Sequence, residues 1–237
     1  MNIVITGASR GIGYEVVKLL CRDSSHRIIA LSRNQNKLDQ LKEECLNINP
    51  HSHLQIIPFD LLDFKGIDQL HLEIMKSFGG VIDVVINNAG AILNKPFLEI
   101  GNVELEYTYQ VNVFAPFKLI QALIPYMGKP NRGHVVNVSS MGGFQGSAKF
   151  AGLTAYSSSK AAIACLSECL AEELKDRNIA VNCLALGAVQ TEMLSEAFPG
   201  YRASFGPGQM AEYIVDFALK GSLYYNGKIL PVSNSTP

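Results

Sequence analysis

The sequence predicts an α/β fold in which a doubly wound parallel sheet of about seven strands carries helices on both faces. Short apolar runs recur along the 237 residues and alternate with longer segments of helical periodicity. Strands that alternate with helices pair in parallel, because each helix carries the chain back across the sheet. A glycine-rich run directly after the first apolar run predicts a ligand-binding turn at one edge of that sheet.

The expected strands are short runs rich in valine, isoleucine and leucine, such as Ile3-Val4-Ile5 in the first and Val84-Val85-Ile86 in the fourth. In chain order they are residues 2–6, 27–31, 54–58, 81–86, 133–138, 179–184 and 228–232. The helices expected between them are residues 12–22, 35–48, 64–78, 102–127, 155–176 and 209–220. Right-handed crossovers bring the carboxyl ends of all these strands to one edge, where doubly wound sheets bind ligands.

The composition favours one globular domain covering residues 1–237, because 48% of the residues are apolar and no proline- or serine-rich linker divides the chain. The net charge is -1 and charges of both signs are scattered, so we expect no nucleic-acid and no membrane partner. The apolar runs are too short for a transmembrane helix, and the first strand leaves no room for a signal peptide. A cytoplasmic protein is therefore expected.

Cysteine and histidine positions predict no metal site. The cysteines are odd in number and form no C-x-x-C pair, so we expect small buried thiols in a reducing compartment. They are Cys21, Cys45, Cys165, Cys169 and Cys183. The histidines have no ligand spacing, and we expect them at the surface. They are His26, His51, His53, His71 and His134.

Region 187–208 is rich in glycine, proline and phenylalanine and has no strong periodicity. It lies near the expected ligand edge, and a loop of this length in a compact domain is usually functional or mobile. We interpret it as the substrate lid.

Three glycines follow the first strand with the spacing G-x-x-x-G-x-G. Glycine lets the backbone turn sharply and approach a ligand, and the next helix aims free amides and its positive dipole end at the turn. A plain structural turn is the alternative, but the position after the first strand favours a pyrophosphate site. Its residues are Gly7, Ala8, Ser9, Arg10, Gly11, Ile12 and Gly13.

The second strand ends in Ser32-Arg33, where a dinucleotide-binding sheet meets the adenosine ribose. An acidic residue there would accept from the 2′-hydroxyl and repel a 2′-phosphate. Arg33 and Arg10 instead offer two guanidinium groups that can converge on a phosphate dianion, unless they are unrelated surface arginines. We therefore predict NADP(H), with NADPH preferred over NADH.

Tyr156 and Lys160 are four residues apart in Leu153–Leu174, a segment patterned as a helix, so they share one face. A tyrosine is a poor acid–base group at neutral pH, and a neighbouring ammonium lowers its pKa and makes it a better proton donor. Because Y-x-x-x-K also arises by chance, an ordinary surface pair is the alternative.

The order of these motifs resembles that of the classical short-chain dehydrogenases/reductases, which have a Rossmann-like fold, over nearly the whole chain. Thr6–Gly13 resembles their cofactor loop, Asp60-Leu61 their adenine contact, and Asn87-Asn88-Ala89-Gly90 the segment that supports sheet and cofactor. The resemblance also implies cofactor contacts by Gly187, Val189 and Thr191. The family's usual Pro-Gly is Leu186-Gly187 here, and the segment Met141–Ala155 is longer than usual.

The same resemblance implies a catalytic tetrad of Asn112, Ser140, Tyr156 and Lys160. Tyr156 would donate the proton, Ser140 would hydrogen-bond the substrate oxygen, and Lys160 would tune the site and contact the ribose. Asn112 would hold a water that links Lys160 to solvent. Ser139 is the other candidate for the serine role, and the family match favours Ser140. The hydride would come from the nicotinamide, with no metal.

The preferred function is an NADPH-dependent reductase of a ketone or aldehyde, reversible in principle. A 3-oxoacyl-carrier-protein reductase is the near alternative, and it requires basic residues at the pocket mouth; Lys129, Arg132 and Arg177 are the candidates. A nucleotide-sensing or scaffolding protein is the alternative of another class, for which an incomplete tetrad would be expected.

The expected pocket residues indicate an apolar small-molecule carbonyl or alcohol substrate. They are Met141, Phe144, Phe150, Met193, Leu194 and Phe198. Family members usually pair through two long helices, here 102–127 and 155–176, so the resemblance implies a homodimer or homotetramer.

Overall fold

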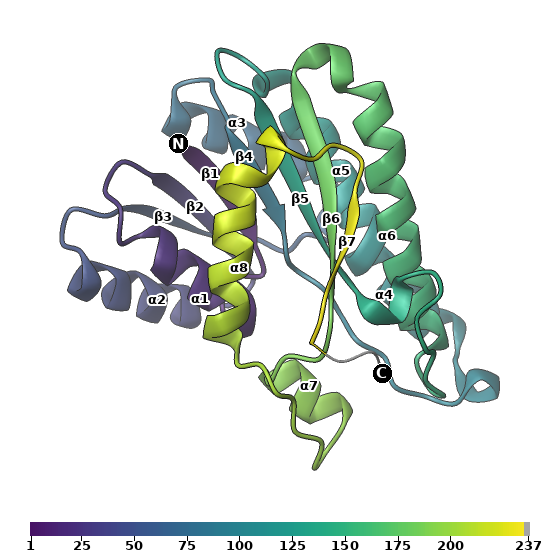
Figure 1. Cartoon of the computed structure of the whole chain (residues 1–237). Helices are drawn as coiled ribbons and strands as arrows, with labels where there is room; N and C mark the ends of the chain where they lie inside the picture. The colour runs from purple at the N-terminus through teal and green to yellow at the C-terminus, as the bar shows by residue number, and fades with distance from the viewer. Residues whose placement is uncertain (235–237) are drawn as a thin grey trace.

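The computed structural model describes residues 1–234, and in this part of the chain seven parallel strands form one sheet in the order β3-β2-β1-β4-β5-β6-β7 (Figure 1). The strands are β1 Asn2–Thr6, β2 Arg27–Ser32, β3 His53–Pro58, β4 Val84–Asn87, β5 Gly133–Ser140, β6 Ile179–Leu186 and β7 Ile229–Val232. The doubly wound parallel α/β fold is therefore confirmed. The last three residues of the domain predicted over 1–237 lie outside the described residues.

Eight α-helices connect or follow these strands within the described residues. They are α1 Gly11–Leu20, α2 Gln35–Ile48, α3 Ile67–Phe78, α4 Asn102–Tyr109, α5 Ala115–Leu123, α6 Thr154–Glu173, α7 Glu192–Ala197 and α8 Pro207–Lys220. Single 3-10 turns occur at Phe97–Glu99, Ile124–Tyr126, Met141–Gly143, Lys175–Arg177 and Gly221–Leu223.

Two predicted segments differ from the structure in a way that bears on the site. The helix predicted over 102–127 is divided into α4 and α5 by a π-helical turn, Gln110–Phe114. The region 187–208 contains the short helix α7, where the Thr191 side chain accepts a hydrogen bond from Leu194 N at 3.2 Å. Six residues are too few to show a helical period, so the sequence did not reveal α7.

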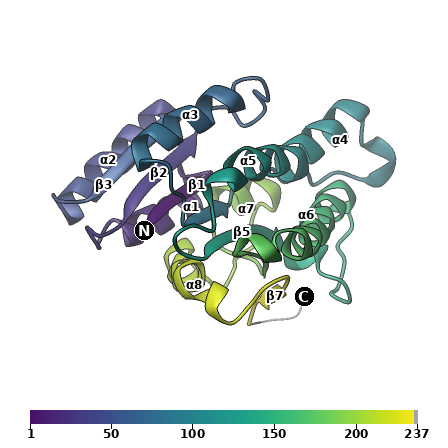
Figure 2. The same ribbon diagram turned by 90° about the horizontal axis from the view of Figure 1, so that it is seen from above.

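The sheet is covered on both faces (Figure 2). Helices α1, α2 and α8 pack on one face, against side chains such as Ile3 and Ile5 of β1. Helices α3, α5 and α6 pack on the other face, to which Val4 of the same strand points. This alternation follows from the period of two along a strand, and it explains why both kinds of position are apolar.

The chain changes direction at β1 and β4, which lie side by side in the middle of the sheet. The segment after β1 crosses to one face and the segment after β4 crosses to the other, so the loops part at the carboxyl ends of these strands. A crevice at such a switch point is where doubly wound sheets bind ligands. No helix of the described residues has the length and apolar character needed to span a membrane.

Three expectations about single residues were wrong. Cys165 and Cys169 are exposed on α6 rather than buried, whereas Cys21, Cys45 and Cys183 are buried as expected. His134, expected at the surface, is only 1% exposed within β5. The sequence pattern did not show this, because the groups that accommodate the imidazole come from β6 and α8.

His134 is held as a neutral imidazole by one acceptor and one donor. Its Nδ1 lies 2.9 Å from the Ala218 carbonyl oxygen, so this nitrogen donates, and its Nε2 accepts from Asn182 Nδ2 at 3.0 Å. A second proton on Nε2 would face the amide donor of Asn182. Burial lowers the pKa of His134 to about 4.

We expect the free energy of unfolding to fall as the pH is lowered from about 6.5 towards 4. The unfolded chain binds a proton at His134 near pH 6.5, whereas the folded chain resists it down to about pH 4. The shift corresponds to at most about 3 kcal/mol of stability, present at neutral pH and lost in that window. Denaturant melts at several pH values measure it. His134→Gln should flatten this dependence and the exposed His51→Gln should not; equal pH profiles for both variants would contradict the assignment.

Candidate functional site

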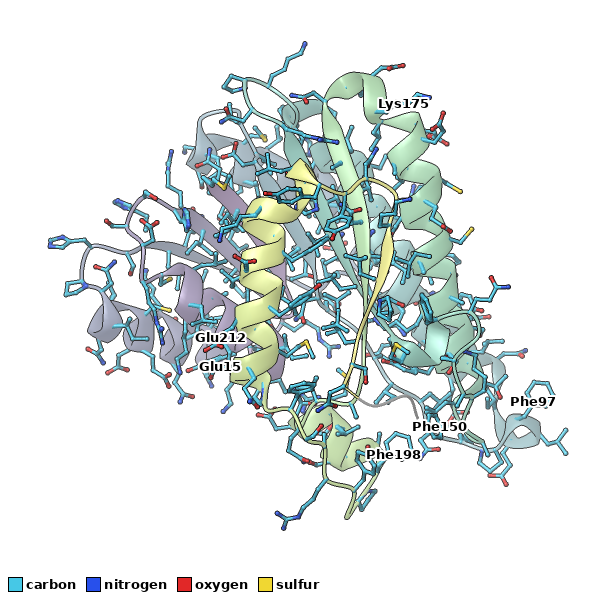
Figure 3. The ribbon with its side chains drawn as sticks, viewed as in Figure 1. Glu15, Phe97, Phe150, Lys175, Phe198 and Glu212 are labelled. Atoms are coloured by element: carbon cyan, nitrogen blue, oxygen red, sulfur yellow. The ribbon has the colours of Figure 1, made fainter. Side chains whose placement is uncertain are left out.

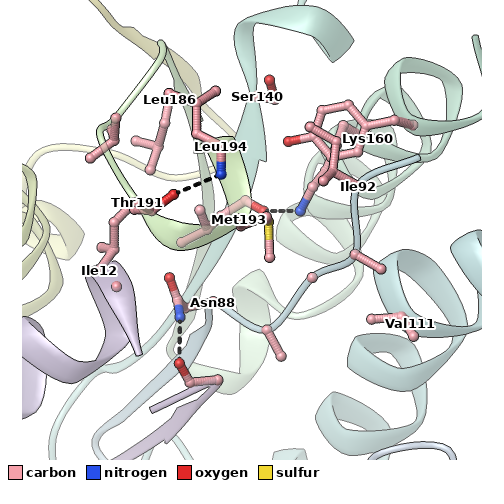
Figure 4. Close-up of a pocket in the computed structure, with 18 of the residues that line it drawn as sticks. Ile12, Asn88, Ile92, Val111, Ser140, Lys160, Leu186, Thr191, Met193 and Leu194 are labelled. Carbon is pink, nitrogen blue, oxygen red and sulfur yellow. Dashed lines mark hydrogen bonds between the residues drawn. The ribbon is translucent and has the colours of Figure 1, made fainter. Parts of the chain in front are cut away.

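A cavity of about 620 Å³ runs along the carboxyl edge of the sheet (Figure 4). Loops that follow β1 to β6 line it. The predicted site residues that it contains are Gly7, Ser9, Arg10, Gly11, Ile12, Ser32, Arg33, Asp60, Leu61, Asn88, Ala89, Gly90, Ser140, Tyr156, Lys160, Gly187, Val189 and Thr191. Ala8, Gly13 and Asn112 are buried behind its wall.

The glycine loop needs glycine for two different reasons. Gly7 and Gly11 have φ values of 71° and 59°, which favour glycine. A Cβ on Gly13 would lie 2.4 Å from the Gly7 carbonyl oxygen and 2.5 Å from Asn88 Nδ2, so here the need is for close approach. The third glycine thus lets α1 begin directly against the loop.

The N-terminus of α1 can receive an anion. Arg10 is its N-cap in an extended conformation, and no side chain within residues 1–234 caps it. The first turn carries no acidic residue. The first amides of a helix have no intrahelical acceptor, so these donors fit a phosphate group.

Hydrogen bonds tie the glycine loop to the end of β4. Thr6 Oγ1 accepts from the main-chain N of Asn88 and of Ala89 at 3.1 and 3.0 Å. Asn88 Nδ2 donates to the carbonyl oxygens of Thr6 and Gly7 at 3.1 and 3.2 Å. Asn88 therefore holds the loop in shape in addition to bordering the cavity.

The predicted adenosine end lies at the ends of β2 and β3. Arg33 is exposed at the rim and Asp60 accepts from Leu62 N at 3.0 Å. Both Arg10 and Arg33 line the cavity, and Glu196 of α7 binds the guanidinium group of Arg10 in this structure. Local spacing could not predict this pair, since 186 residues separate its members.

The two serines at the end of β5 have different partners. Ser139 Oγ donates to the Lys160 carbonyl oxygen at 2.6 Å and so fastens β5 to α6. Ser140 Oγ accepts from Gly142 N at 3.1 Å, and its side chain interacts with Tyr156 so as to lower the pKa of that phenol. The geometry thus favours Ser140 as the serine that acts with the tyrosine.

Burial governs the titration of Tyr156 and Lys160. Burial raises the pKa of Tyr156 above its ordinary value, and the hydrogen bond with Ser140 opposes this. Burial lowers the pKa of Lys160 to about 8. Lys160 Nζ donates to the Val138 carbonyl oxygen at 2.9 Å and lies 6.0 Å from the centre of the Tyr156 ring. The expected lowering of the Tyr156 pKa by Lys160 is not seen here: burial raises this pKa, and the interaction that opposes burial comes from Ser140.

Asn112 connects two walls of the site from the π-helical turn. Its Oδ1 accepts from Ala91 N at 2.8 Å, and its Nδ2 donates to the Ala91 carbonyl oxygen and to Ser159 Oγ, both at 2.9 Å. A Cβ on Gly90 would lie 3.2 Å from Lys160 Nζ and 3.3 Å from Asn112 Oδ1. Gly90 thereby brings the loop after β4 close to both side chains.

Sequence reasoning missed a polar ladder behind the site. Asn87 Nδ2 donates to Asn137 Oδ1 at 2.8 Å, and Asn137 Nδ2 donates to Ser167 Oγ at 2.9 Å. The ladder joins β4, β5 and α6 inside the protein. Asn137 follows two valines of β5, so a polar residue inside an apolar strand was the available signal.

One part of the cavity is lined by charged side chains and the other part by uncharged, mainly apolar ones. Its charged lining residues come from the glycine loop, the loops after β2 and β3, the start of α7, and α6. In that order they are Arg10, Arg33, Asp60, Glu192 and Lys160. The remaining wall is uncharged and mainly apolar. It includes Ile92, Tyr107, Val111, Met141, Phe150, Leu153, Met193, Leu194, Phe198 and Tyr201. Phe144, expected in the pocket, does not line it.

The basic residues considered for a carrier-protein surface lie at the opposite edge of the sheet. Lys129 and Arg132 precede β5, and Arg177 precedes β6. Figure 3 shows the same separation, with Lys175 far from Phe150 and Phe198. No group of three or more potential metal ligands occurs among residues 1–234.

Comparison with known proteins identifies relatives over most of the chain. Residues 1–202 match the family model described as short chain dehydrogenase. The chain is 32% identical over 215 residues to a fatty acyl-CoA reductase of Acinetobacter baylyi, covering 90% of this chain and 70% of that protein.

Solved structures agree with this match. A short chain dehydrogenase from Salmonella enterica serovar Typhi superimposes with a TM-score of 0.87 and 30% identity, covering 97% of this chain and 94% of that one. A short chain dehydrogenase from Shigella flexneri in complex with NADP gives a TM-score of 0.86 and 30% identity, and the match covers 97% of this chain and 95% of that one.

Alanine at Gly13 should destabilise the protein, by about 1–3 kcal/mol, because its Cβ would overlap the Gly7 carbonyl. Gly208, also in the first turn of a helix, has no neighbour within 4 Å of an added Cβ. Gly208→Ala should be neutral or stabilising by up to about 1 kcal/mol. Thermal unfolding of both variants checks this, and equal melting temperatures would contradict the close approach.

Proposed function

The chain belongs to the short-chain dehydrogenase family, and from this premise we propose that it is a reductase that uses NADPH to reduce the carbonyl group of an apolar ketone or aldehyde. The family's enzymes are oxidoreductases that bind a nicotinamide cofactor. The observation that carries the proposal is the convergence of Ser140, Tyr156 and Lys160 on a cavity whose other end is the uncapped glycine loop.

The donor set fits a dinucleotide phosphate. The amides at the start of α1 would bind the pyrophosphate, and Asn88 keeps the loop open for it. No acidic residue ends β2, and Arg33 stands at the rim where a 2′-phosphate would be bound. The NADP in the related Shigella structure adds support for NADPH.

Tyr156 is suited to donate a proton from its hydroxyl oxygen. Its raised pKa keeps that proton in place at neutral pH, so the donor form is the populated one. Ser140 has one hydroxyl proton, which it can donate to the substrate oxygen. The Lys160 ammonium group donates to the Val138 carbonyl oxygen and adds positive charge to the site, 6.0 Å from the centre of the Tyr156 ring.

The protein's further contribution is placement. Ser139 and Lys160 anchor the first turns of α6 to β5, and Asn112 anchors the same helix to the loop after β4 through Ser159. When bound, the nicotinamide supplies the hydride. An orientation fixed by these bonds needs no rearrangement during proton transfer.

The uncharged wall supports an apolar substrate. A carboxylate or phosphate group on the substrate would find no cationic side chain in this uncharged wall, which extends from the loop after β4 to α7 and the residues that follow it. The name of the Acinetobacter relative, a fatty acyl-CoA reductase, fits a substrate with an apolar chain. A carrier-protein substrate is less well supported, because Lys129, Arg132 and Arg177 are remote from the cavity.

Self-association is supported by an exposed apolar face on α4 and α5. Val103 and Tyr107 of α4, Phe114 of the π-helical turn, and Phe117 of α5 are 40–81% exposed. The neighbouring α6 exposes Cys165 and Cys169. An apolar face of this kind suits pairing with a second copy of the chain.

Tyr156→Phe should lower kcat with NADPH by about 10²–10⁴-fold, because the proton donor is lost. Nucleotide affinity should remain, since the phosphate-binding loop is untouched. Tyr201→Phe removes a hydroxyl from the rim of the same cavity and is the matched control. NADPH oxidation against ketones and aldehydes, with nucleotide binding by fluorescence, measures both quantities. Equal turnover by Tyr156→Phe and wild type would contradict the proposal, and bound nucleotide without turnover would favour a sensing role.

Within a series of straight-chain 2-ketones, kcat/KM should rise about fourfold for each added methylene until the chain covers the apolar wall. The factor follows because burying one CH₂ group contributes about 0.8 kcal/mol. Phe150→Ala should reduce this increase, because Phe150 lines the cavity while 47% exposed. Phe97→Ala is the control, since Phe97 is exposed but outside the cavity (Figure 3). A flat series, or faster reduction of ω-carboxylated analogues, would contradict an apolar substrate.

A further inference from the structure

Helix α7 presents two carboxylates to the glycine loop. Arg10 Nη1 donates to Glu196 Oε1 at 2.6 Å, and Nη2 lies 3.3 Å from Oε2, so the pair is bidentate. Glu192, one turn earlier, has a carboxylate oxygen 3.8 Å from the Cβ position of Gly11. The pair raises the pKa of Arg10 and lowers the pKa of Glu196. A loop built to bind phosphate is thus faced by acidic side chains.

The topology gives Arg10 two possible partners in different directions. The loop follows β1, and β2 is the neighbour of β1 on one side; β2 ends at Ser32, and Arg33 is the next residue. Helix α7 follows β6, which lies beyond β4 and β5 on the other side. When Glu196 binds the guanidinium group of Arg10, that group is therefore directed towards α7. A 2′-phosphate bound beside Arg33 would require the same group to turn towards β2.

We propose that Glu196 competes with the 2′-phosphate of NADPH for Arg10, and that Glu196 is therefore a determinant of cofactor specificity. This inference rests on the NADPH preference proposed above. A phosphate dianion captures Arg10 and releases α7 from the glycine loop. NADH has no 2′-phosphate, so it leaves the pair intact. Asn94 Nδ2, which donates to the Ala197 carbonyl oxygen at 2.8 Å, continues to hold the far end of α7.

The exposure of the pair sets the size of the effect. The side chains of Arg10 and Glu196 are 44% and 62% exposed, and exposed ion pairs contribute little and are screened by salt. Loss of the competing carboxylate should therefore tighten binding of the 2′-phosphate only roughly two- to fivefold, and less at high salt.

Calorimetric titration with adenosine 2′,5′-bisphosphate and with 5′-AMP tests the inference without any reaction. Glu196→Gln keeps the shape of the side chain and removes its charge. Glu212→Gln makes the same charge change on exposed α8 and is the matched control (Figure 3). Arg10→Gln and the double variant Arg10→Gln/Glu196→Gln complete a thermodynamic cycle.

The expected result is tighter binding of the bisphosphate by Glu196→Gln, unchanged binding of 5′-AMP, and no gain from Glu196→Gln in the Arg10→Gln background. An unchanged or weaker bisphosphate affinity in Glu196→Gln, with wild type still preferring the bisphosphate, would overturn the competition and leave the proposed function standing. Equal affinity of the wild type for both nucleotides would contradict the NADPH preference itself, and the competition with it.

Discussion

The polar seam between β5 and α6 is the constraint on which the site depends. Ser139 Oγ donates to the Lys160 carbonyl oxygen of the helix, Lys160 Nζ donates to the Val138 carbonyl oxygen of the strand, and Asn137 joins the two elements again through Ser167. Gly143 allows the turn after β5 to approach the helix, because a Cβ there would lie 2.5 Å from the Lys160 carbonyl carbon. Tyr156 lies one turn before Lys160, so this seam sets where its hydroxyl group meets Ser140. Each of these buried polar groups has a partner, as burial requires.

A second organising feature is the separation of charge along the cavity. The cofactor end combines helix amides, arginines and carboxylates, whereas the wall beyond Tyr156 is nearly free of charge. A charged substrate entering that wall would lose its hydration without compensation. Helix α7 lies at the boundary, with Glu192 and Glu196 towards the glycine loop and Met193 and Leu194 among the lining residues. Helix α7 thus contributes side chains both to the charged end of the cavity and to its apolar end.

Much of the fold and of the site could be predicted because local spacing along the chain carries the information. Alternating apolar runs and amphipathic segments predicted the doubly wound sheet. Gly7, Gly11 and Gly13 predicted the loop at the start of α1, and the spacing of Tyr156 and Lys160 placed both on one helical face. The structure differs from these expectations in local detail. For example, a π-helical turn that contains Asn112 interrupts the helix predicted over 102–127.

The fold class, the glycine loop and the set of polar residues at the carboxyl edge follow from the order of residues along the chain, since periodicity and spacing act between residues close in sequence. The partner of each polar group, in contrast, is set by the packing of elements that are distant in sequence. This packing turned Ser139 to α6 and Ser140 to Tyr156, paired Arg10 with Glu196, and buried His134 against Ala218 and Asn182. Those outcomes depend on atoms brought together from distant segments. Desolvation, which raises the pKa of Tyr156 and lowers that of Lys160, likewise exists only once the surrounding elements have packed.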